Sequence, residues 1–342
     1  MKKFLLLSAT LLMSLVANAD VEINETNFPD ANFRNYLLSQ SWGSDGELTD
    51  QEISEITSLN VSSKSITSLK GIEFFTALKY LYCYDNQLTS LDVSKNTALT
   101  YLECDENLLT SLDVSNCTAL TSLGCNQNQL TSLDVSKNTA LKELRCINNN
   151  QLTSLNVSNC TALEKLYCYN NQLTSLDVSN CTALTDLECD NNQLTSLDVS
   201  KNTALKELFC YNNQLTSLDV SKNTALTDLR CYQNQIKGAG MDAFVNSLPQ
   251  QTRASLYIYY PSNTEGNVCT TSHVGIAKQK RWIVYYYNNG LWEEYAGSDP
   301  SGIQSVTLGK DTNTPIYDLN GRRLESPKKG INIIGGKKVV VK

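Results

Sequence analysis

A pattern of 21 residues repeats along residues 78–236, and it constrains the fold more than any other feature of the sequence. Each copy reads Leu-x-x-Leu-x-Cys-x-x-Asn-x-Leu-Thr-Ser-Leu-Asp-Val-Ser, with few exceptions. The cysteine recurs every 21 residues, with one 22-residue step after the fourth: Cys83, Cys104, Cys125, Cys146, Cys168, Cys189, Cys210 and Cys231. A fixed period of this length, with leucine and asparagine at set positions, predicts a stacked solenoid.

Alternation within one copy indicates strands rather than helices. In the first copy, Leu81 and Cys83 alternate with tyrosines, a period of two that is typical of a strand with one buried face. Asn86 follows where the chain must turn, and a buried asparagine there can bond backbone groups that apolar residues cannot. Leu91 and Val93 alternate again on the return path, where the short period leaves little room for a helix.

The repeat resembles that of bacterial leucine-rich-repeat surface proteins, broadly internalin-like, with cysteine in place of the third consensus leucine. The resemblance covers residues 56–236, and it implies a fold and a habit of binding but no chemistry. We therefore predict a leucine-rich-repeat solenoid of the α/β horseshoe class, a right-handed coil of mostly short parallel β-strands with little helix. No single copy can bury its apolar face alone, so we expect a cap at each end.

Residues 1–19 have the composition of a secretory signal peptide. Two lysines precede an apolar run over residues 4–16, and Ala17-Asn18-Ala19 forms a small-x-small cleavage site. The apolar run is too short to span a bilayer, and no other segment is apolar enough to be a transmembrane segment. We expect the protein to be secreted and displayed at the cell surface or released outside the cell.

Residues 20–55 are expected to form a helical N-terminal cap. Within it, residues 41–52 partly resemble an EF-hand loop, because Gly46 falls at the sharp turn and Asp45 and Glu52 fall at ligand positions. Serine and glycine stand where further acidic or amide ligands belong. The sequence leaves two alternatives: a calcium site at Asp45 and Glu52, or a metal-free helix-loop-helix lid over the first repeat.

The repeat ends before residues 237–298, which are expected to form a C-terminal α/β cap. After a short amphipathic helix, we expect strands over 254–260 and 281–287 and a helix over 271–280. The alternative is an independent sugar-binding domain whose aromatic rings would stack on sugars: Trp282, Tyr285, Tyr286, Tyr287, Trp292 and Tyr295.

Residues 299–309 form a linker by composition, and residues 310–342 are expected to form a small β tail of two or three strands. The tail is similar to the end of a type IX secretion sorting domain, on the sequence Asp-Leu-Asn-Gly-Arg at residues 318–322 and a Gly-Ile-x-Ile segment. It is shorter than such a domain, and Asn332 replaces an aromatic residue. The resemblance implies sorting to the cell surface.

Charge excludes two classes of partner. The whole chain has 28 basic and 35 acidic residues. The signal contributes two lysines, and the tail contributes eight basic and three acidic residues. The remaining body therefore has 18 basic and 32 acidic residues, a net charge of −14. A body this acidic argues against nucleic acid and anionic membrane as partners, because phosphate recognition needs the opposite sign.

The twelve cysteines follow the repeat rather than a disulfide framework. Cys117, Cys160 and Cys181 share a second ladder position with asparagines in other copies, which indicates a packed turn and not obligatory pairing. We expect mostly free, buried thiols that act as small apolar side chains. There is no Cys-x-x-Cys and only one histidine, so neither a zinc site nor any other cofactor is predicted.

Nothing in the sequence predicts an enzyme. The lone His273 lies in the expected C-terminal cap, and no serine flanked by glycines, as at a nucleophile turn, lies near it in the sequence. The aspartates that recur once per copy in Leu-Asp-Val-Ser are outward structural positions on the return path. We predict that the protein is non-enzymatic.

The copies differ from one another at the outward positions of the strand, which the fold does not restrict. Tyrosine is frequent there, and carboxylates outnumber cations by ten to three. Tyrosine offers a large rigid surface at low entropic cost, and an acidic strip suits a basic protein or peptide. The predicted ligand-binding residues are Tyr80, Tyr82, Tyr84, Tyr101, Glu103, Asp105, Arg145, Lys165, Tyr167, Tyr169, Glu188, Asp190, Phe209, Tyr211, Arg230 and Tyr232.

Two other interpretations of this face stay open. The first is a carbohydrate-binding surface protein that uses the same tyrosines, with acidic and amide side chains on sugar hydroxyls. The second is a purely structural surface-layer component, which predicts self-association and no ligand. Tyrosine and threonine also suit exposed strand positions without any ligand.

Overall fold

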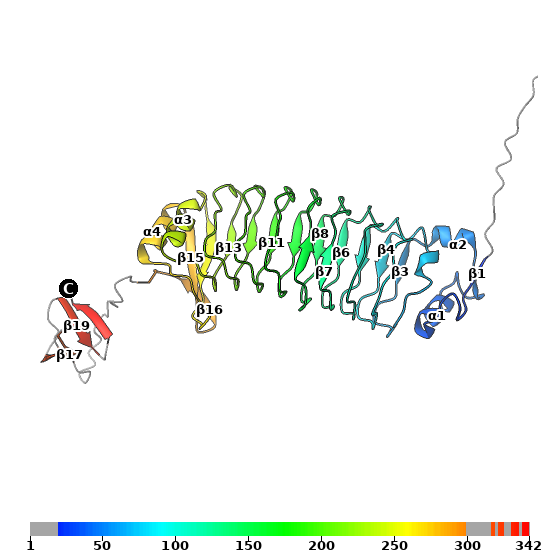
Figure 1. The fold of residues 1–342 in the computed structure, drawn as a ribbon, viewed down its shortest axis with the longest axis horizontal. Coiled ribbons are helices and arrows are strands. Elements are labelled where there is room, and N and C mark those ends of the chain that lie inside the picture. The colour runs from blue at the N-terminus through cyan, green and yellow to red at the C-terminus, as the bar shows by residue number, and fades with distance from the viewer. Residues whose placement is uncertain (1–19, 299–315, 319–320, 325–329, 335–336, 342) are drawn as a thin grey trace, which may run out of the picture.

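The computed structural model describes residues 20–298, 316–318, 321–324, 330–334 and 337–341. The predicted signal peptide at residues 1–19 and the predicted linker at residues 299–309 lie outside these ranges. The chain winds into a long solenoid with strands along one side, α1 and α2 at one end, and α3 and α4 at the other (Figure 1).

A single sheet of twelve strands runs along one side of the solenoid. It starts at β3 (Ser58–Asn60) and continues with three-residue strands at the repeat period: β4 (Tyr80–Tyr82), β5 (Tyr101–Glu103), β6 (Ser122–Gly124), β8 (Glu143–Arg145), β10 (Lys165–Tyr167), β11 (Asp186–Glu188), β12 (Glu207–Phe209) and β13 (Asp228–Arg230). Neighbouring strands are parallel and in register, so Leu81, Leu102 and Leu123 lie side by side. The prediction of a parallel-strand leucine-rich-repeat solenoid with little helix is confirmed.

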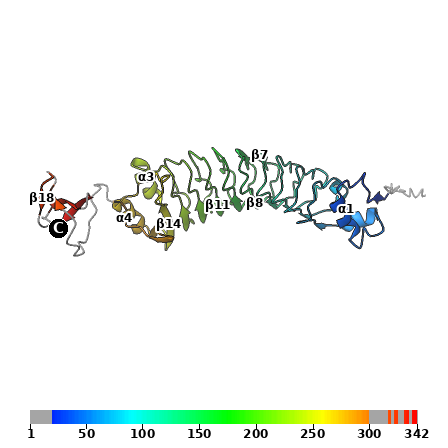
Figure 2. The same cartoon turned by 90° about the horizontal axis from the view of Figure 1, so that it is seen from below.

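The return path carries little regular structure. Among the residues that the structure describes, only β7 (Ser132–Asp134) and β9 (Ser154–Asn156) are strands there, and they pair with each other in parallel. β7 lies on the opposite side of the solenoid from β8 and β11 (Figure 2). Each turn is therefore as thin as its short period requires.

The core is a stack of leucines with one cysteine in each turn. The cysteines of the main ladder, from Cys83 to Cys231, are all fully buried. Burial raises the pKa of the Cys146 thiol to about 12, so this thiol stays protonated at neutral pH. These cysteines pack as small apolar side chains, as the sequence predicts.

A ladder of buried asparagines joins each turn to the one before it. The Asn128 amide donates to the carbonyls of Cys125, at 3.3 Å, and of Cys104 in the preceding turn, at 3.0 Å. Its Oδ1 accepts the backbone N–H of Leu109 at 3.0 Å. One side chain thus satisfies backbone groups of two turns that the core would otherwise leave without partners.

The second ladder explains why asparagine and cysteine interchange. Asn202 donates to the carbonyls of Val178 and Cys181 at 2.9 and 2.8 Å, while its own Oδ1 is buried without a partner. The Cys117 thiol occupies the same position and faces the carbonyls of Val93 and Asn96 at 3.5 and 3.7 Å. Both side chains act as donors only, so cysteine loses little when it replaces asparagine.

One extra residue interrupts the asparagine ladder in the middle of the array. It lies in the turn between the buried Asn149 and Leu152. Elsewhere in the array, the leucine two residues after a ladder asparagine donates its N–H to the next ladder asparagine, but the Leu152 N–H donates to the Asn149 carbonyl at 2.7 Å. The Oδ1 of Asn171 is consequently buried without a partner among the described residues.

Deleting one of the three consecutive asparagines at residues 148–150 should stabilise the protein. The deletion gives one sequence whichever asparagine is removed, and it restores the regular period. The Leu152 N–H can then donate to the Oδ1 of Asn171. We expect this bond to raise the free energy of unfolding by about 1 kcal/mol in urea titrations. The reciprocal control inserts one asparagine after Asn192 and should lower it by a similar amount. A deletion that destabilises the chain would contradict this account.

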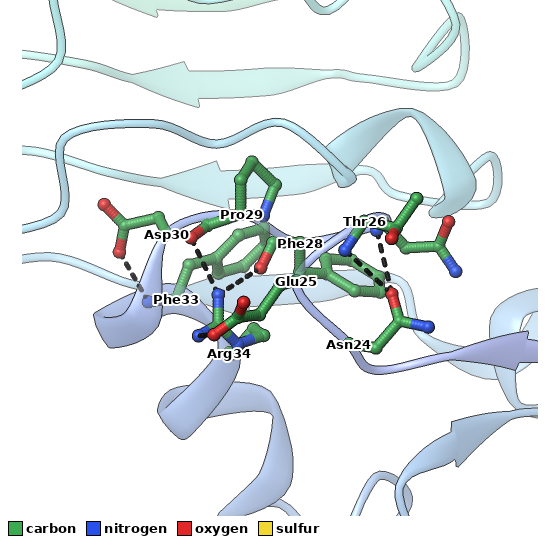
Figure 3. Close-up of polar contacts among 9 residues, drawn as sticks. Asn24, Glu25, Thr26, Phe28, Pro29, Asp30, Phe33 and Arg34 are labelled. Carbon is green, nitrogen blue, oxygen red and sulfur yellow. Dashed lines mark hydrogen bonds and ion pairs between the residues drawn. The ribbon is translucent and has the colours of Figure 1, made fainter.

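The N-terminal end is closed by a strand pair and two helices. β1 (Val21–Glu22) pairs with β2 (Glu47–Leu48), and α1 (Ala31–Leu38) and α2 (Asp50–Glu55) flank them. Arg34 donates to the carbonyls of Phe28 and Pro29, both at 2.7 Å (Figure 3). Asp30 caps α1 through the Phe33 N–H and also accepts the Thr67 N–H at 2.8 Å, which fixes the helix to the first turn.

The segment that partly resembles an EF-hand uses its carboxylates for backbone bonds. Glu52 forms a capping box with Thr49 at the start of α2, accepting the Thr49 N–H at 2.9 Å. Asp45 accepts the Glu47 N–H at 3.2 Å. No group of three or more His, Cys, Asp and Glu side chains in the described part of the chain is placed to hold a metal ion. Both candidate calcium ligands thus accept backbone N–H groups of the N-terminal cap.

The C-terminal end extends the long sheet instead of only covering it. After α3 (Ala239–Ser247), β14 (Ala254–Tyr259) pairs in parallel with β13, and β15 (Trp282–Asn288) pairs in parallel with β14. α4 (Thr271–Gln279) lies between them in sequence, and β16 (Leu291–Glu294) ends the sheet antiparallel to β15. The expected helix and strands are present, and the β15–β16 hairpin is additional.

The tail has more strands than the sequence predicts. β17 (Ile316–Tyr317), β18 (Arg323–Leu324), β19 (Gly330–Ile334) and β20 (Lys337–Val341) form an antiparallel sheet of four strands in the order β18-β17-β19-β20. Across the described ranges, the helices are short, and none has the length and apolar character needed to cross a bilayer.

Candidate binding face

The outward side of the long sheet, which we call the concave face, carries every predicted ligand-binding residue. In-register pairing sorts these side chains into three rows along the solenoid axis. The first row contains Tyr80, Tyr101 and Lys165, and the second contains Tyr82, Glu103, Arg145, Tyr167, Glu188, Phe209 and Arg230. The third contains Tyr84, Asp105, Tyr169, Asp190, Tyr211 and Tyr232.

In the N-terminal half of the concave face, Arg145 pairs with neighbouring carboxylates. Arg145 on β8 reaches over β6 to Glu103 on β5, with 2.7 Å between guanidinium and carboxylate. The contact spans two strand spacings because the intervening residue, Gly124, has no side chain. Tyr101 also donates to Glu103, at 2.5 Å, and burial with this bond raises the pKa of the Tyr101 phenol to about 12.

A shallow depression of about 300 Å³ lies beside this ion pair. Its lining includes Tyr84, Asp105, Glu106 and Asn126 together with Arg145. The Asp105 carboxylate accepts the Asn126 N–H at 2.7 Å, and its burial raises its pKa. The depression contains both donors and acceptors, with one cation among three carboxylates, Glu103 included.

The C-terminal half contains two carboxylates, Glu188 and Asp190, that make no salt bridge with any described residue. Glu188 on β11 stands between Tyr167 and Phe209 on the neighbouring strands. Burial, followed by the charge of Asp190, raises the pKa of Glu188 to about 7. Burial also raises the pKa of Asp190 to about 6.

Asp190 is more buried than the sequence suggests for a ligand-binding residue. Only 2% of it is exposed, and its carboxylate accepts from the Asn191 amide at 2.6 Å and from the Tyr211 phenol. Burial and the Asp190 charge raise the pKa of Tyr211 well above its usual range. The Asp190 carboxylate therefore lies beneath the tyrosine rings, while the Glu188 carboxylate is half-buried at the surface.

Arg230, the nearest cation along the second row, is already occupied. Its guanidinium bonds Asp228 at 3.2 Å and lies over the Phe209 ring, 4.0 Å from the ring centroid. It also lies 5.0 Å from the centroid of Tyr257. Cation–π contacts of this kind hold the guanidinium over the two rings. Its charge partly offsets the rise in the pKa values of Glu188 and Asp190, although it makes no salt bridge with either.

The concave face continues into residues that the sequence analysis assigned to the cap. Tyr232 stacks on Tyr211 with centroids 4.5 Å apart and contacts Tyr260 and Trp292. Further ring contacts join Tyr257 to Tyr285 and Tyr260 to Tyr287. Period-two alternation over residues 254–260 could have indicated this exposed aromatic row, but not its register against β13.

The aromatic residues of the alternative sugar-binding domain do not form one platform. Trp282 is 1% exposed and donates to the Pro249 carbonyl at 2.8 Å, so its assignment to a sugar platform is wrong. Tyr295 stacks on Tyr259, whereas Trp292 joins the row described above. Trp282 serves the core of the C-terminal end, and Trp292 serves the concave face.

The single histidine makes hydrogen bonds within the C-terminal cap. His273 Nδ1 accepts the Thr270 N–H at 2.9 Å in a capping box at the start of α4, and Nε2 lies 2.9 Å from Asp242 of α3. The recurring aspartates of the return path also bond their own turns. Asp113, for example, accepts the Ser115 N–H at 2.9 Å, and this bonding to Ser115 lowers its pKa.

Comparisons with known proteins agree with this geometry. A family model described as leucine-rich repeats (2 copies) matches residues 161–202. Internalin J of Listeria monocytogenes is 41% identical over 71 residues, which are 20% of this chain and 8% of that protein.

Two solved structures share the fold. The functional domain of internalin J from Listeria monocytogenes, described as including a cysteine ladder, is 32% identical, with a TM-score of 0.55 over 80% of this chain and 62% of that one. A leucine-rich-repeat protein of Leptospira interrogans is 25% identical, with a TM-score of 0.54 over 61% of this chain and 57% of that one. The chain thus matches less than two thirds of each of these proteins. The chain has the fold of a leucine-rich-repeat solenoid with a cysteine ladder in its core, and in this it is similar to the functional domain of internalin J.

Proposed function

We propose that the protein is exported, catalyses no reaction, and binds a basic protein or peptide through the C-terminal half of its concave face. The Glu188–Asp190 pair carries this proposal. Two carboxylates that lack a salt bridge and lie among aromatic rings are costly in the free protein, and a lysine or arginine side chain would reduce that cost. The leucine-rich repeats and the likeness to internalin J support a role in protein interaction.

The spacing of the rings fits a long cationic side chain. Parallel strands are about 4.8 Å apart, so Tyr167 and Phe209 stand roughly 10 Å apart on either side of Glu188. A guanidinium between them would have an aromatic face on both sides and carboxylates beneath it. Export rests on the predicted signal peptide, and surface display rests on the tail that is similar to a sorting domain.

The test compares neutralised carboxylates with a matched control. We would measure fluorescence anisotropy of a short labelled peptide of alternating arginine and alanine, beside its glutamate counterpart and neutral oligosaccharides. The Glu188→Gln, Asp190→Asn double variant should bind the arginine peptide at least about 10-fold more weakly, and salt should weaken wild-type binding further. Glu106→Gln, on the same face but in the N-terminal half, should bind like wild type.

Two results would count against the proposal. Unchanged peptide binding by the double variant would move the site away from Glu188. Salt-insensitive binding of oligosaccharides, lost when Tyr167, Tyr169 and Tyr211 are replaced by alanine, would favour the carbohydrate interpretation. The double variant should stay folded, because neutral side chains relieve a buried repulsion.

A further inference from the structure

A second pocket lies at the C-terminal end of the solenoid, and its lining residues are not among the predicted ligand-binding residues. It has a volume of about 410 Å³ and opens where β14, α4, β15 and β16 meet. Arg253, Lys278 and Arg281 line it together with Glu294, and Trp282 contributes to its apolar wall. Its balance of three cations and one acid is unusual on a chain whose net charge is −7.

Two of the three cations have no partner. Lys278 lies 3.8 Å from Glu294, a long contact between exposed side chains. The guanidinium groups of Arg253 and Arg281 make no hydrogen bond, ion pair or ring contact with the residues that the structure describes. Ala254 pairs with Trp282, so the two arginines lie next to the starts of the adjacent strands β14 and β15, each one residue before its strand.

Arg281 holds its side chain in a backbone conformation that favours glycine. Arg281 follows the last turn of α4 with a φ of +64°, the left-handed conformation that helix ends usually give to glycine. A side chain is strained there, and glycine would relieve the strain. The next residue, Trp282, is locked by its bond to the Pro249 carbonyl, so the arginine projects from a rigid base.

We propose that this pocket binds an organic oxyanion: a carboxylate, sulfate or phosphate group joined to an apolar body. Adjacent guanidinium groups match the paired oxygens of such a group, and the fork geometry of arginine favours two parallel hydrogen bonds. Ile283 and the edge of Trp282 would contact the apolar part. This pocket is separate from the carboxylates of the concave face, and its proposed ligand is an anion rather than a cation.

The probes are sodium sulfate, phosphate, acetate and benzoate, each titrated against chloride at matched ionic strength by calorimetry. Wild type should bind at least one oxyanion saturably. Sulfate or phosphate would identify a tetrahedral dianion as the preferred group, and acetate or benzoate would identify a carboxylate. Arg281→Gly should weaken that binding at least about 10-fold and should fold at least as stably as wild type. Arg253→Gln should weaken it similarly.

Asn289→Gly is the matched control. Asn289 also has a positive φ, of 45°, in the β15–β16 turn, so its replacement relieves the same kind of strain without removing a charge. It should bind oxyanions like wild type. No binding beyond chloride, or equal binding by wild type and Arg281→Gly, would overturn the proposal. Binding of the arginine peptide should be unchanged by Arg281→Gly, so either proposal can fail without the other.

Discussion

Replacing Asn213 with alanine is expected to lower the free energy of unfolding by about 3–4 kcal/mol. The Asn213 amide donates to the carbonyls of Cys189 and Cys210 at 3.0 and 3.2 Å, and its Oδ1 accepts the Leu194 N–H at 2.9 Å. Alanine leaves these backbone groups buried between two turns. Each unpaired group costs about 1–3 kcal/mol, and the cavity admits little water to replace the amide.

Asn202→Cys is the matched control for this prediction. Asn202 is buried as well, but cysteine already stands at the equivalent position in other turns, and the asparagine Oδ1 has no partner to lose. We expect a loss below about 1 kcal/mol. Urea unfolding followed by circular dichroism measures both variants. Equal losses for the two would mean that burial alone, and not the bonds of the first ladder, decides the cost.

The period of the repeat was sufficient to predict the solenoid because every ladder position has one environment. A residue type that recurs at the position of Cys104 or Asn107 in each copy must suit a buried position whose neighbours are copies of itself. The interruption near Asn149 was visible in the spacing, but its consequence was not. That consequence is a hydrogen bond moved from Asn171 to a carbonyl in the preceding turn, which depends on the path of the backbone.

The candidate binding face was predictable only where the repeat holds. Outward positions follow from period two, so the rows of tyrosines and carboxylates could be assigned residue by residue. Beyond the repeat, the register of Asp228 against Ser255 brings Tyr257 into the second row, and no local pattern sets that register. The bond from Arg145 to Glu103 across Gly124 spans 42 residues of sequence and depends on a missing side chain.

The affinity for the arginine peptide is expected to fall about 100-fold between pH 8 and pH 5.5. A bound guanidinium favours ionised carboxylates, so binding must expel the protons that Glu188 and Asp190 take up below their pKa values of about 7 and about 6. The stability of the folded protein depends on pH in the opposite direction from the affinity, because it falls as the pH rises. Because both folded pKa values are raised, the stability these groups contribute is complete below pH of about 4 and is lost as the pH rises through 6 and 7.

Anisotropy titrations at constant ionic strength across this range measure the effect. Glu188→Gln should lower the affinity at pH 8 and flatten the profile, since one of the two titrating groups is removed. Glu106→Gln should keep the wild-type slope, because it removes a carboxylate from the same face without touching the pair. If wild-type affinity does not change between pH 8 and pH 5.5, the guanidinium does not contact Glu188 and Asp190, and the charge of the whole face must steer the peptide instead.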